Sequence, residues 1–392
     1  MFLIFLLLVI FLGYGIIELR NHHSNVHKIP IRIQVNGTRG KSSVTRLIAG
    51  GLRASGMRTL AKTTGTKPRF IISDQEEFPI KRLGKANILE EIKIFRQAKK
   101  YRPQAMVIEC MALVPEYQRI ECEKLVQTTH GVITNVRADH LDVMGPTVKD
   151  VAIALANTIP KNGYLFTAEN FYLPYFKKVA KKRNTKLYHA DPNTVTDEEM
   201  KGFSYIEHKE NVALALLVCE HFGVGRKTAL AGMYRAKPDS GVMRIYTIGD
   251  FNKRIKLVYT MAANDPDSIM MLWTMCLNRF QTECKEVIVL INCRDDRADR
   301  SKQLGELCAQ KMPANYYLAT GFLTSVFIRS ALNNGIAKDK IIDLGGKSPA
   351  EIYAKTFQLI EKDGLVFATG NTVGFGEMLI NYFAQKGVEN DY

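Results

Sequence analysis

The sequence predicts an α/β protein: an N-terminal transmembrane helix, a P-loop-type central domain with a mostly parallel sheet, and a Rossmann-like C-terminal domain. Three observations support this fold class. First, the first 17 residues are almost wholly apolar. Second, residues 31–52 read as a strand, a glycine turn and an amphipathic helix. Third, strand and helix patterns alternate from there onward. Such alternation is typical of parallel sheets with crossover helices. A chain of 392 residues is long enough for two or three domains.

Residues 1–17 form the predicted anchor. The run is at the short end of what spans a bilayer, with no basic residue before it and no small-residue cleavage site after it. Arg20, Lys28 and Arg32 follow it, so the positive-inside rule places the rest of the chain in the cytoplasm. We therefore expect a single-pass cell-membrane protein, with a polar linker over residues 18–29. The alternative is a buried helix of a soluble domain.

The first strand ends in a loop with the composition of a phosphate site. Ile31, Ile33 and Val35 alternate as in a strand, and a helix with an apolar face opens at Lys41. A glycine turn leading into a helix N-terminus binds phosphate well. The predicted phosphate-binding residues are Gly37, Thr38, Arg39, Gly40, Lys41, Ser42 and Ser43. The common P-loop pattern requires a glycine where Val35 stands, so an ordinary glycine-rich turn is the alternative.

Two apolar runs, residues 104–110 and 130–136, predict strands buried on both faces. The first ends on Glu109, and the second leads into a loop that contains Asp139, His140 and Asp142. Ligands bind at the carboxyl ends of strands in such sheets. Because Mg²⁺ prefers oxygen ligands and tolerates imidazole, Ser42, Glu109 and this loop, with Asp139, His140 and Asp142, are candidates to hold it. A helix cap with a polar turn is the alternative for the His140 loop.

The remaining central domain, residues 30–238, alternates predicted strands and helices. A short strand is expected to begin at residue 59, and further strands are expected at 163–167 and 186–190. Helices are expected at 88–100, 148–158, 170–183 and 210–219. Residues 72–87 look irregular. A Pro- and Gly-containing segment over 237–244 predicts an interdomain linker, from which Arg244 could reach a ligand.

The C-terminal domain, residues 239–392, has five predicted strands, at 256–262, 286–292, 316–320, 340–344 and 365–370. Polar loops follow three of these strands, at 264–266, 292–300 and 370–372. The second loop carries Arg294, Arg297 and Arg300 among aspartates. An arginine guanidinium group can form two parallel hydrogen bonds to a carboxylate, so this loop predicts anion binding. A solvated charged turn has the same composition and is the alternative.

A net charge of +15 favours binding of an anionic partner, which could be nucleic acid, an anionic membrane or an acidic small substrate. The chain has no finger spacing, no RNP motif and no basic run with interleaved aromatics, so we predict no nucleic-acid partner. Seven dispersed cysteines without a C-x-x-C pair predict free thiols in a reducing compartment and no zinc site.

Taken together, the motifs resemble the Mur ligase superfamily of ATP-dependent amide-forming ligases, over about residues 30 to 392. They are Asn36-Gly-Thr-Arg-Gly-Lys-Ser42, Thr63-Thr-Gly-Thr66, Glu109, Thr134-Asn135, Asp139-His-Leu-Asp142, Asn211 and Arg244. The resemblance implies ATP and Mg²⁺, catalytic roles for Lys41, Glu109, His140 and Arg244, and nucleotide contacts from Asn211 and Arg244. Many Mur ligases carry a carbamylated lysine where Ala156 stands, which leaves a second Mg²⁺ site open.

Within that superfamily, the chain resembles the ligase subunits of capsule-type poly-γ-glutamate synthases. The resemblance lies in the short N-terminal segment before the P-loop and in the local sequences around Glu109, Asp139 and Asn292. The resemblance implies glutamate and a poly-γ-glutamate chain as substrates and small membrane subunits as partners, and it leaves a homo-oligomer open. Substrate contacts are expected from Arg294, Arg297, Arg300, Asn264 and Asp265. The last two stand in 261–266, which lacks the first Asp and the His of the family's D-x-A-H-N-P loop.

Two other functions fit the same residues less well. A folylpolyglutamate-type ligase acts on a soluble metabolite and needs no anchor. A membrane-anchored NTPase could energise polymer export, although a GTPase would need an N-K-x-D motif that residues 252–255 lack.

Overall fold

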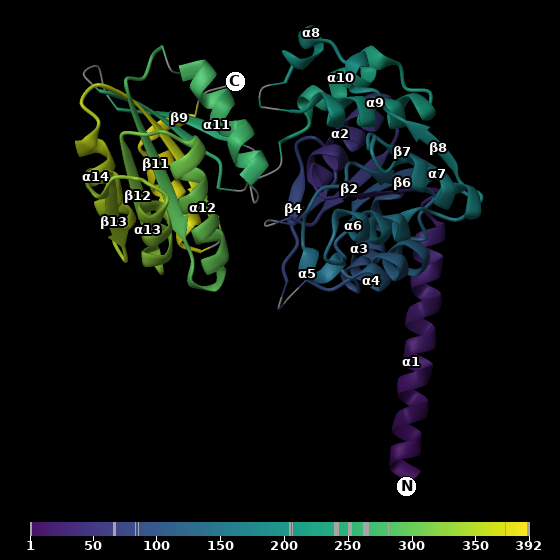
Figure 1. Cartoon of the computed structure of the whole chain (residues 1–392). Coiled ribbons are helices and arrows are strands. Elements are labelled where there is room, and N and C mark those ends of the chain that lie inside the picture. The colour runs from purple at the N-terminus through teal and green to yellow at the C-terminus, as the bar shows by residue number, and fades with distance from the viewer. Residues whose placement is uncertain are drawn as a thin grey trace. The chain divides into compact units, whose positions relative to one another are not determined.

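The computed structural model describes residues 2–65, 68–82, 84, 86–203, 205, 207–238, 243–249, 253–261, 266–280, 282–372 and 374–389. The chain forms two compact units, one of Met1–Phe203 with Glu207–Asp239 and one mainly of Ser240–Tyr392 (Figure 1). Each unit has its own sheet.

A single long helix, α1 (Phe2–His27), begins the first unit and projects from it (Figure 1). It is long and apolar enough to cross a membrane, and its apolar side chains from Phe2 to Leu19 are exposed. The predicted polar linker over 18–29 is wrong, because the helix continues through most of it. His22, Asn25 and Val26 are buried, and His22 Nε2 lies 2.8 Å from the carbonyl oxygen of Leu125. Pro30 disfavours further helix at the residue before it, which accounts for the end at His27.

The first unit is built on an eight-stranded sheet in the order β4-β3-β2-β5-β1-β6-β7-β8. The six strands β2, β5, β1, β6, β7 and β8 are parallel to one another. β3 and β4 form an antiparallel edge next to β2. The bounds are β1 Ile31–Asn36, β2 Thr59–Thr63, β3 Arg69–Ile71, β4 Glu77–Pro79, β5 Ala105–Glu109, β6 His130–Ile133, β7 Tyr164–Thr167 and β8 Lys186–His189. The segment expected to be irregular therefore contains the short strand β4. β1 lies at the centre of this sheet and leads directly into the P-loop.

Helices cover both faces of that sheet. They are α2 Lys41–Ala54, α3 Glu90–Ala98, α4 Pro115–Ile120, α5 Leu141–Met144, α6 Val148–Leu155, α7 Leu173–Lys182, α8 Asp197–Met200, α9 Lys209–His221 and α10 Arg226–Arg235. The apolar face of α2 is buried through Val44, Leu47, Ile48 and Leu52, as the helical spacing predicts.

The second unit has a seven-stranded sheet in the order β13-β12-β11-β14-β10-β9-β15. The strands are β9 Arg244–Gly249, β10 Arg254–Tyr259, β11 Glu286–Cys293, β12 Tyr316–Gly321, β13 Ile341–Gly345, β14 Asp363–Gly370 and β15 Gly387–Glu389. The five predicted strands are parallel to one another. β9 pairs antiparallel with β10, and β15 pairs antiparallel with β9. The prediction that Arg244 lies in a linker is wrong, because Arg244 is the first residue of β9.

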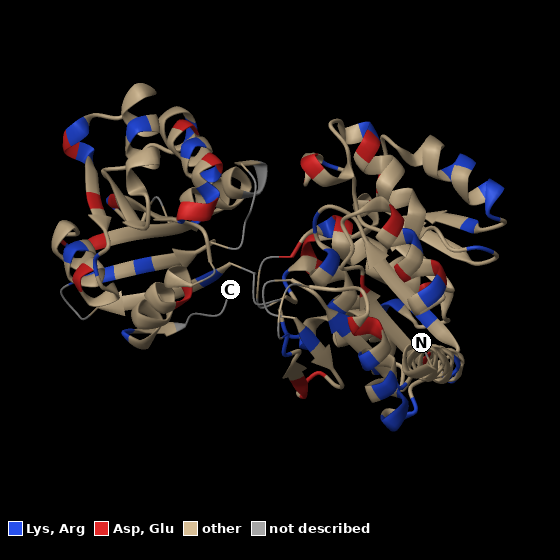
Figure 2. Cartoon of the chain, turned by 90° about the horizontal axis from the view of Figure 1, so that it is seen from below, with Lys and Arg blue, Asp and Glu red and all other residues tan. Residues whose placement is uncertain are grey.

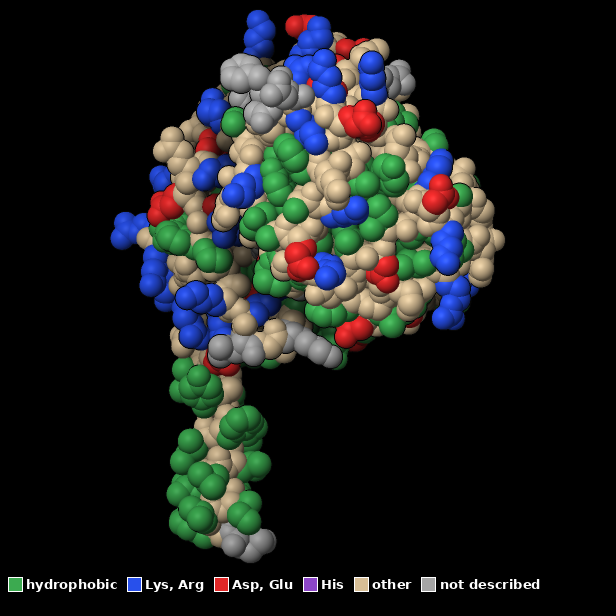
Figure 3. Space-filling view, turned by 90° about the vertical axis from the view of Figure 1, so that its left-hand side faces the viewer, with side chains coloured by type: hydrophobic (Ala, Val, Ile, Leu, Met, Phe, Trp, Pro, Cys, Tyr) green, Lys and Arg blue, Asp and Glu red, His purple; other side chains and the backbone are tan. Residues whose placement is uncertain are grey.

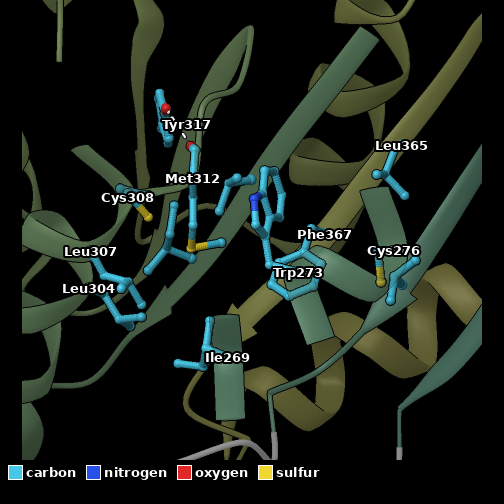
Figure 4. Packing of buried hydrophobic residues seen from close by; sticks show 14 of the residues in the cluster. Ile269, Trp273, Cys276, Leu304, Leu307, Cys308, Met312, Tyr317, Leu365 and Phe367 are labelled. Atoms are coloured by element: carbon cyan, nitrogen blue, oxygen red, sulfur yellow. Dashed lines mark hydrogen bonds between the residues drawn. The ribbon is translucent and has the colours of Figure 1, made fainter. Parts of the chain in front are cut away.

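Both faces of the second sheet are buried under helices α11 Pro266–Phe280, α12 Ala298–Lys311, α13 Thr324–Asn333, α14 Pro349–Leu359 and α15 Phe375–Gln385. In the core between the sheet and α11 and α12, Trp273 packs edge-on against Phe367 with ring centroids 5.2 Å apart (Figure 4). Strands buried on both faces need continuous apolar runs, which is why these five were readable from the sequence. The α/β fold class is thus confirmed.

Candidate active site

The P-loop has the backbone geometry of a phosphate cradle. Gly37 and Gly40 have φ angles of 132° and 77°, and α2 starts at Lys41 directly after them. A Cβ atom on Gly37 would lie 2.0 Å from Thr134 Oγ1, so the loop packs too closely there for any other residue. The N-terminus of α2 has no side-chain cap, which leaves its N–H groups available to an anion.

The end of β6 holds the P-loop in place. The Thr38 hydroxyl donates to Asn135 Oδ1 at 2.7 Å, and the Arg39 N–H donates to the same oxygen at 3.0 Å. The Thr134 hydroxyl donates to the carbonyl oxygen of Arg39 at 2.6 Å. Thr134 and Asn135 entered the sequence interpretation only as part of a motif, and the structure shows that they position the loop.

Ser42 and Glu109 form the centre of the candidate metal site. The Ser42 hydroxyl donates to Glu109 Oε2 at 2.8 Å, and the N–H of Thr64 donates to the same oxygen at 2.8 Å. Glu109 ends β5 and is buried. A hydroxyl and a carboxylate beside a phosphate loop are hard oxygen donors of the kind that Mg²⁺ binds. These two residues therefore fit the predicted metal.

His140 lies on the loop after β6, where its backbone adopts a left-handed conformation, with a φ angle of 44°, and precedes α5. Its side chain is exposed, and Nε2 lies 3.9 Å from Asp139 Oδ1. Asp139 in turn pairs with Arg39 of the P-loop at 3.5 Å. In the described part of the chain, no cluster of three His, Cys, Asp or Glu residues is close enough to hold a metal. The predicted contribution of His140 stays a prediction.

Lys41 and Asn211 both lie against the loop. Lys41 Nζ donates to the carbonyl oxygens of Gly37 and Thr38, at 2.7 and 3.4 Å. A Cβ atom on Gly40 would lie 2.6 Å from Asn211 Oδ1, and Asn211 Nδ2 donates to Glu207 Oε1 at 2.7 Å. Asn211 thus supports the glycine turn from behind. Its predicted contact with nucleotide stays a prediction.

Glu207 is buried beneath the P-loop. Burial raises its pKa to about 7, even though hydrogen bonds from Asn211, the backbone of His208 and Ser43 favour the charged form. Sequence reasoning did not single out this residue, which lies in a polar stretch before α9.

A buried ionic cluster lies beside the candidate metal site, and sequence reasoning missed it. Lys62, at the end of β2, forms ion pairs with Glu91 and with Glu90, the latter at 3.0 Å. Arg82 binds Glu90 through two hydrogen bonds of 2.7 and 3.1 Å. Lys62 and Glu91 are fully buried. Burial alone lowers the pKa of Lys62, but the surrounding carboxylates outweigh it, so the pKa lies above its usual value. A lysine within a short strand was the one available signal.

Glu121 connects this cluster to the strand that carries Glu109. Its two oxygens accept hydrogen bonds from the N–H groups of Met111 and Ala112, at 3.2 and 3.1 Å. Burial and the neighbouring Glu91 raise its pKa to about 7. The two buried carboxyls of the cluster, Glu91 and Glu121, both have a pKa above the usual value, because burial disfavours their charged forms. The cluster fixes the backbone that follows Glu109.

The predicted substrate arginines lie in the second unit, after β11. Arg294 pairs with Asp296 through hydrogen bonds of 2.9 and 2.7 Å. Arg300 donates to the carbonyl oxygen of Gly370 at 2.8 Å and to Asn371 Oδ1 at 3.2 Å. Arg300 therefore joins two of the three predicted polar loops. Arg297 is the residue directly before α12. Asn264 and Asp265 lie outside the described residues.

Ala156 is buried beside the core around α6, and no amine stands at that position. The structure therefore offers no lysine there for a second metal site.

Comparisons with known proteins place the chain in a family. The family description "Mur ligase middle domain" matches residues 35–237, and "Poly-gamma-glutamate synthase CapB C-terminal domain" matches residues 245–386. The chain is 40% identical over 391 residues to the capsule biosynthesis protein CapB of Bacillus anthracis, covering 99% of this chain and 83% of that protein. It is 38% identical over 385 residues to the PGA synthase CapB of Bacillus subtilis (strain 168), covering 97% of each.

Solved structures agree on the fold. A bifunctional folylpolyglutamate synthase/dihydrofolate synthase from Yersinia pestis, complexed with AMPPNP and Mn, matches with a TM-score of 0.64 and 12% identity, over 94% of this chain and 92% of that one. MurF from Acinetobacter baumannii matches with a TM-score of 0.66 and 14% identity, over 95% and 80%. The chain belongs to the Mur ligase family of ATP-dependent ligases, in the branch of the poly-γ-glutamate synthases.

Proposed function

We propose that this chain is the ATP-dependent amide ligase of poly-γ-glutamate capsule synthesis. It activates a glutamate or chain-end carboxylate as an acyl phosphate, which a glutamate amine then attacks. The observation that carries the proposal is the hydrogen bond of Ser42 to Glu109 beside the P-loop. The 40% identity to a capsule biosynthesis protein over nearly the whole chain supports the choice of polymer.

The proposed chemistry follows from the leaving group. A carboxylate does not react with an amine, because oxide leaves poorly. In the first step a carboxylate oxygen attacks the γ-phosphorus of ATP, and ADP leaves. In the second step the neutral amine attacks the acyl carbon, the bond from carbon to the phosphate oxygen breaks, and phosphate leaves. Phosphoryl transfer depends mainly on positioning and charge neutralisation.

The P-loop residues would do the positioning. The N–H groups from Gly37 to Ser42 and the ammonium of Lys41 would bind the β- and γ-phosphates. Ser42, Glu109 and His140 would hold Mg²⁺, which neutralises phosphate charge when bound. Arg244 would contact the nucleotide or the transferring phosphate, and Asn211 the nucleotide, as in the family.

In the second unit, Arg294, Arg297 and Arg300 would bind the carboxylates of incoming glutamate, together with Asn264 and Asp265. Arg300 already binds Gly370 and Asn371, so it would act partly by holding the two loops together. The growing polymer is a polyanion, which suits a chain of net charge +15.

We also propose that α1 anchors the chain in the cell membrane as a single span, with both units in the cytoplasm. The proposed partners are the small membrane subunits that assemble and export the polymer. A homo-oligomer is compatible with this arrangement.

The test uses the purified full-length chain with ATP, Mg²⁺, glutamate and a short γ-glutamate oligomer. Glutamate-stimulated ADP release, together with an oligomer one residue longer by mass spectrometry, is the expected result. Turnover that requires a folate acceptor would instead favour a folylpolyglutamate-type ligase. ADP release that is indifferent to any amino acid would favour an NTPase that energises export.

A further inference from the structure

A pocket of about 1040 Å³ lies on the first unit, between α1, the β3–β4 edge and α3. Tyr14 and Glu18 of α1 line it on one side. The segment that leads into α3 and α3 itself line the other side. It is lined neither by the P-loop nor by Glu109, so it is distinct from the candidate active site.

The pocket lies where α1 would leave a bilayer. The apolar run from Phe2 to Ile17 is about 24 Å long at ~1.5 Å per residue, at the short end of what spans a hydrocarbon core of ~30 Å. Tyr14 and Glu18 therefore lie near the level of the lipid headgroups, where tyrosine is enriched. Lys and Arg residues gather on the body around the point where α1 leaves it (Figures 2 and 3).

The lining is part apolar and part cationic. Phe78, Ile80 and Leu89 contribute apolar surface, and the side chains of Phe78 and Leu89 are exposed. Lys81 and Lys93 contribute positive charge, and neither forms an ion pair with any residue that the structure describes.

The acidic residues of the pocket do not neutralise those lysines. Glu90 binds Arg82 with two hydrogen bonds, and Glu18 pairs with Arg96 at 3.4 Å. The positive charges of Lys81 and Lys93 thus have no counterion among the described lining residues. Near a membrane, each such lysine is attracted to anionic lipid.

We propose that this pocket binds one anionic glycerophospholipid, with its phosphate at Lys81 and Lys93 and the start of its acyl chains on Phe78 and Leu89. A zwitterionic lipid lacks the net charge that the lysines attract, and a free phosphate lacks the apolar part. The proposal rests on the membrane position proposed for α1 and is independent of the ligase chemistry.

The test is native mass spectrometry of the full-length chain in detergent, titrated with dihexanoyl phosphatidylglycerol, dihexanoyl phosphatidylcholine or glycerol phosphate. Only phosphatidylglycerol is expected to bind tightly. The double variant Lys81→Glu/Lys93→Glu should weaken its binding about tenfold or more. The control variant Lys338→Glu/Lys340→Glu carries the same charge change at exposed positions of the second unit and should bind as the unmodified chain does.

Equal binding of phosphatidylcholine, or equal binding of glycerol phosphate, would overturn the proposal. Unchanged lipid binding by the Lys81/Lys93 variant would also overturn the proposal. If that variant instead loses a co-purifying membrane protein while it still binds lipid, the two lysines bind a protein and the proposal is likewise overturned. Glutamate-dependent ADP release by the same variant in detergent should remain unchanged. That readout shows that the variant is folded and separates failure of the lipid proposal from failure of the ligase proposal.

Discussion

Ser42 and Glu109 are 67 residues apart in the sequence, and in the structure the hydroxyl of the first donates to a carboxylate oxygen of the second at 2.8 Å. This contact joins the N-terminus of α2 to the end of β5. It brings the phosphate loop and a buried carboxylate to the same edge of the sheet, where ligands bind in folds of this type.

Ser42→Ala should raise the Mg²⁺ concentration needed for half-maximal ADP release by about 10–100-fold, because it removes an oxygen from the proposed metal site. The thermal midpoint should hardly change. Ser55→Ala is a matched control, since that hydroxyl lies at the other end of α2 and donates to the carbonyl oxygen of Leu52. An unchanged Mg²⁺ requirement in Ser42→Ala would remove Ser42 from the metal site.

Lys62→Met should destabilise the first unit by about 3–5 kcal/mol, because it leaves Glu91 buried without its cation. The double variant Lys62→Met/Glu91→Leu should recover much of that loss, since it removes the unpaired charge as well. Urea unfolding followed by far-UV circular dichroism measures both, with the exposed Lys178→Met as control. A double variant no more stable than Lys62→Met would contradict the ion-pair interpretation.

Glu207→Gln should change how stability depends on pH. A carboxyl whose pKa rises on folding, here from about 4.5 to about 7, holds its proton more tightly in the folded state. Its contribution is full below pH 4.5 and is lost as the pH rises through 7, at up to ~1.4 kcal/mol per pH unit. Urea midpoints measured from pH 5 to 8 should fall less steeply in Glu207→Gln. An equal slope in both proteins would show that Glu207 keeps an ordinary pKa.

The arginines after β11 should separate into two classes. Arg297→Ala should raise the KM for glutamate about tenfold or more without a change in thermal midpoint. Arg300→Ala should also lower stability by about 1.5–3 kcal/mol, because Gly370 and Asn371 lose a charged donor. Steady-state kinetics and thermal unfolding, with the exposed Arg329→Ala as control, measure both effects. An unchanged KM in Arg297→Ala would exclude Arg297 from the glutamate site.

The parts of the fold that the sequence predicted are local or strongly periodic. The P-loop needed only residues 31–52, where alternation, glycines and helical spacing follow one another. The parallel strands of both units were readable because each is a continuous apolar run.

The parts that it missed depend on contacts between distant segments. β9 follows a Pro- and Gly-containing segment, and its antiparallel pairing with β10 has no signature in its own residues. The helical end of α1 looked like a polar linker, but His22 and Val26 are buried against the first unit. Lys62 pairs with Glu90 and Glu91 only after β2 and α3 pack together, so the periodicity within either element carries no signal of the ion pairs.

The measurement that tests the central claim most directly is oxygen transfer during one round of ligation. The carboxylates of both glutamate and a short γ-glutamate oligomer are labelled with ¹⁸O, and the chain is supplied with these two substrates, ATP and Mg²⁺. Amide formation through an acyl phosphate predicts one ¹⁸O atom in each phosphate released and none in the ADP, with no transfer by Lys41→Ala. Amide formation that leaves the phosphate unlabelled would contradict the account.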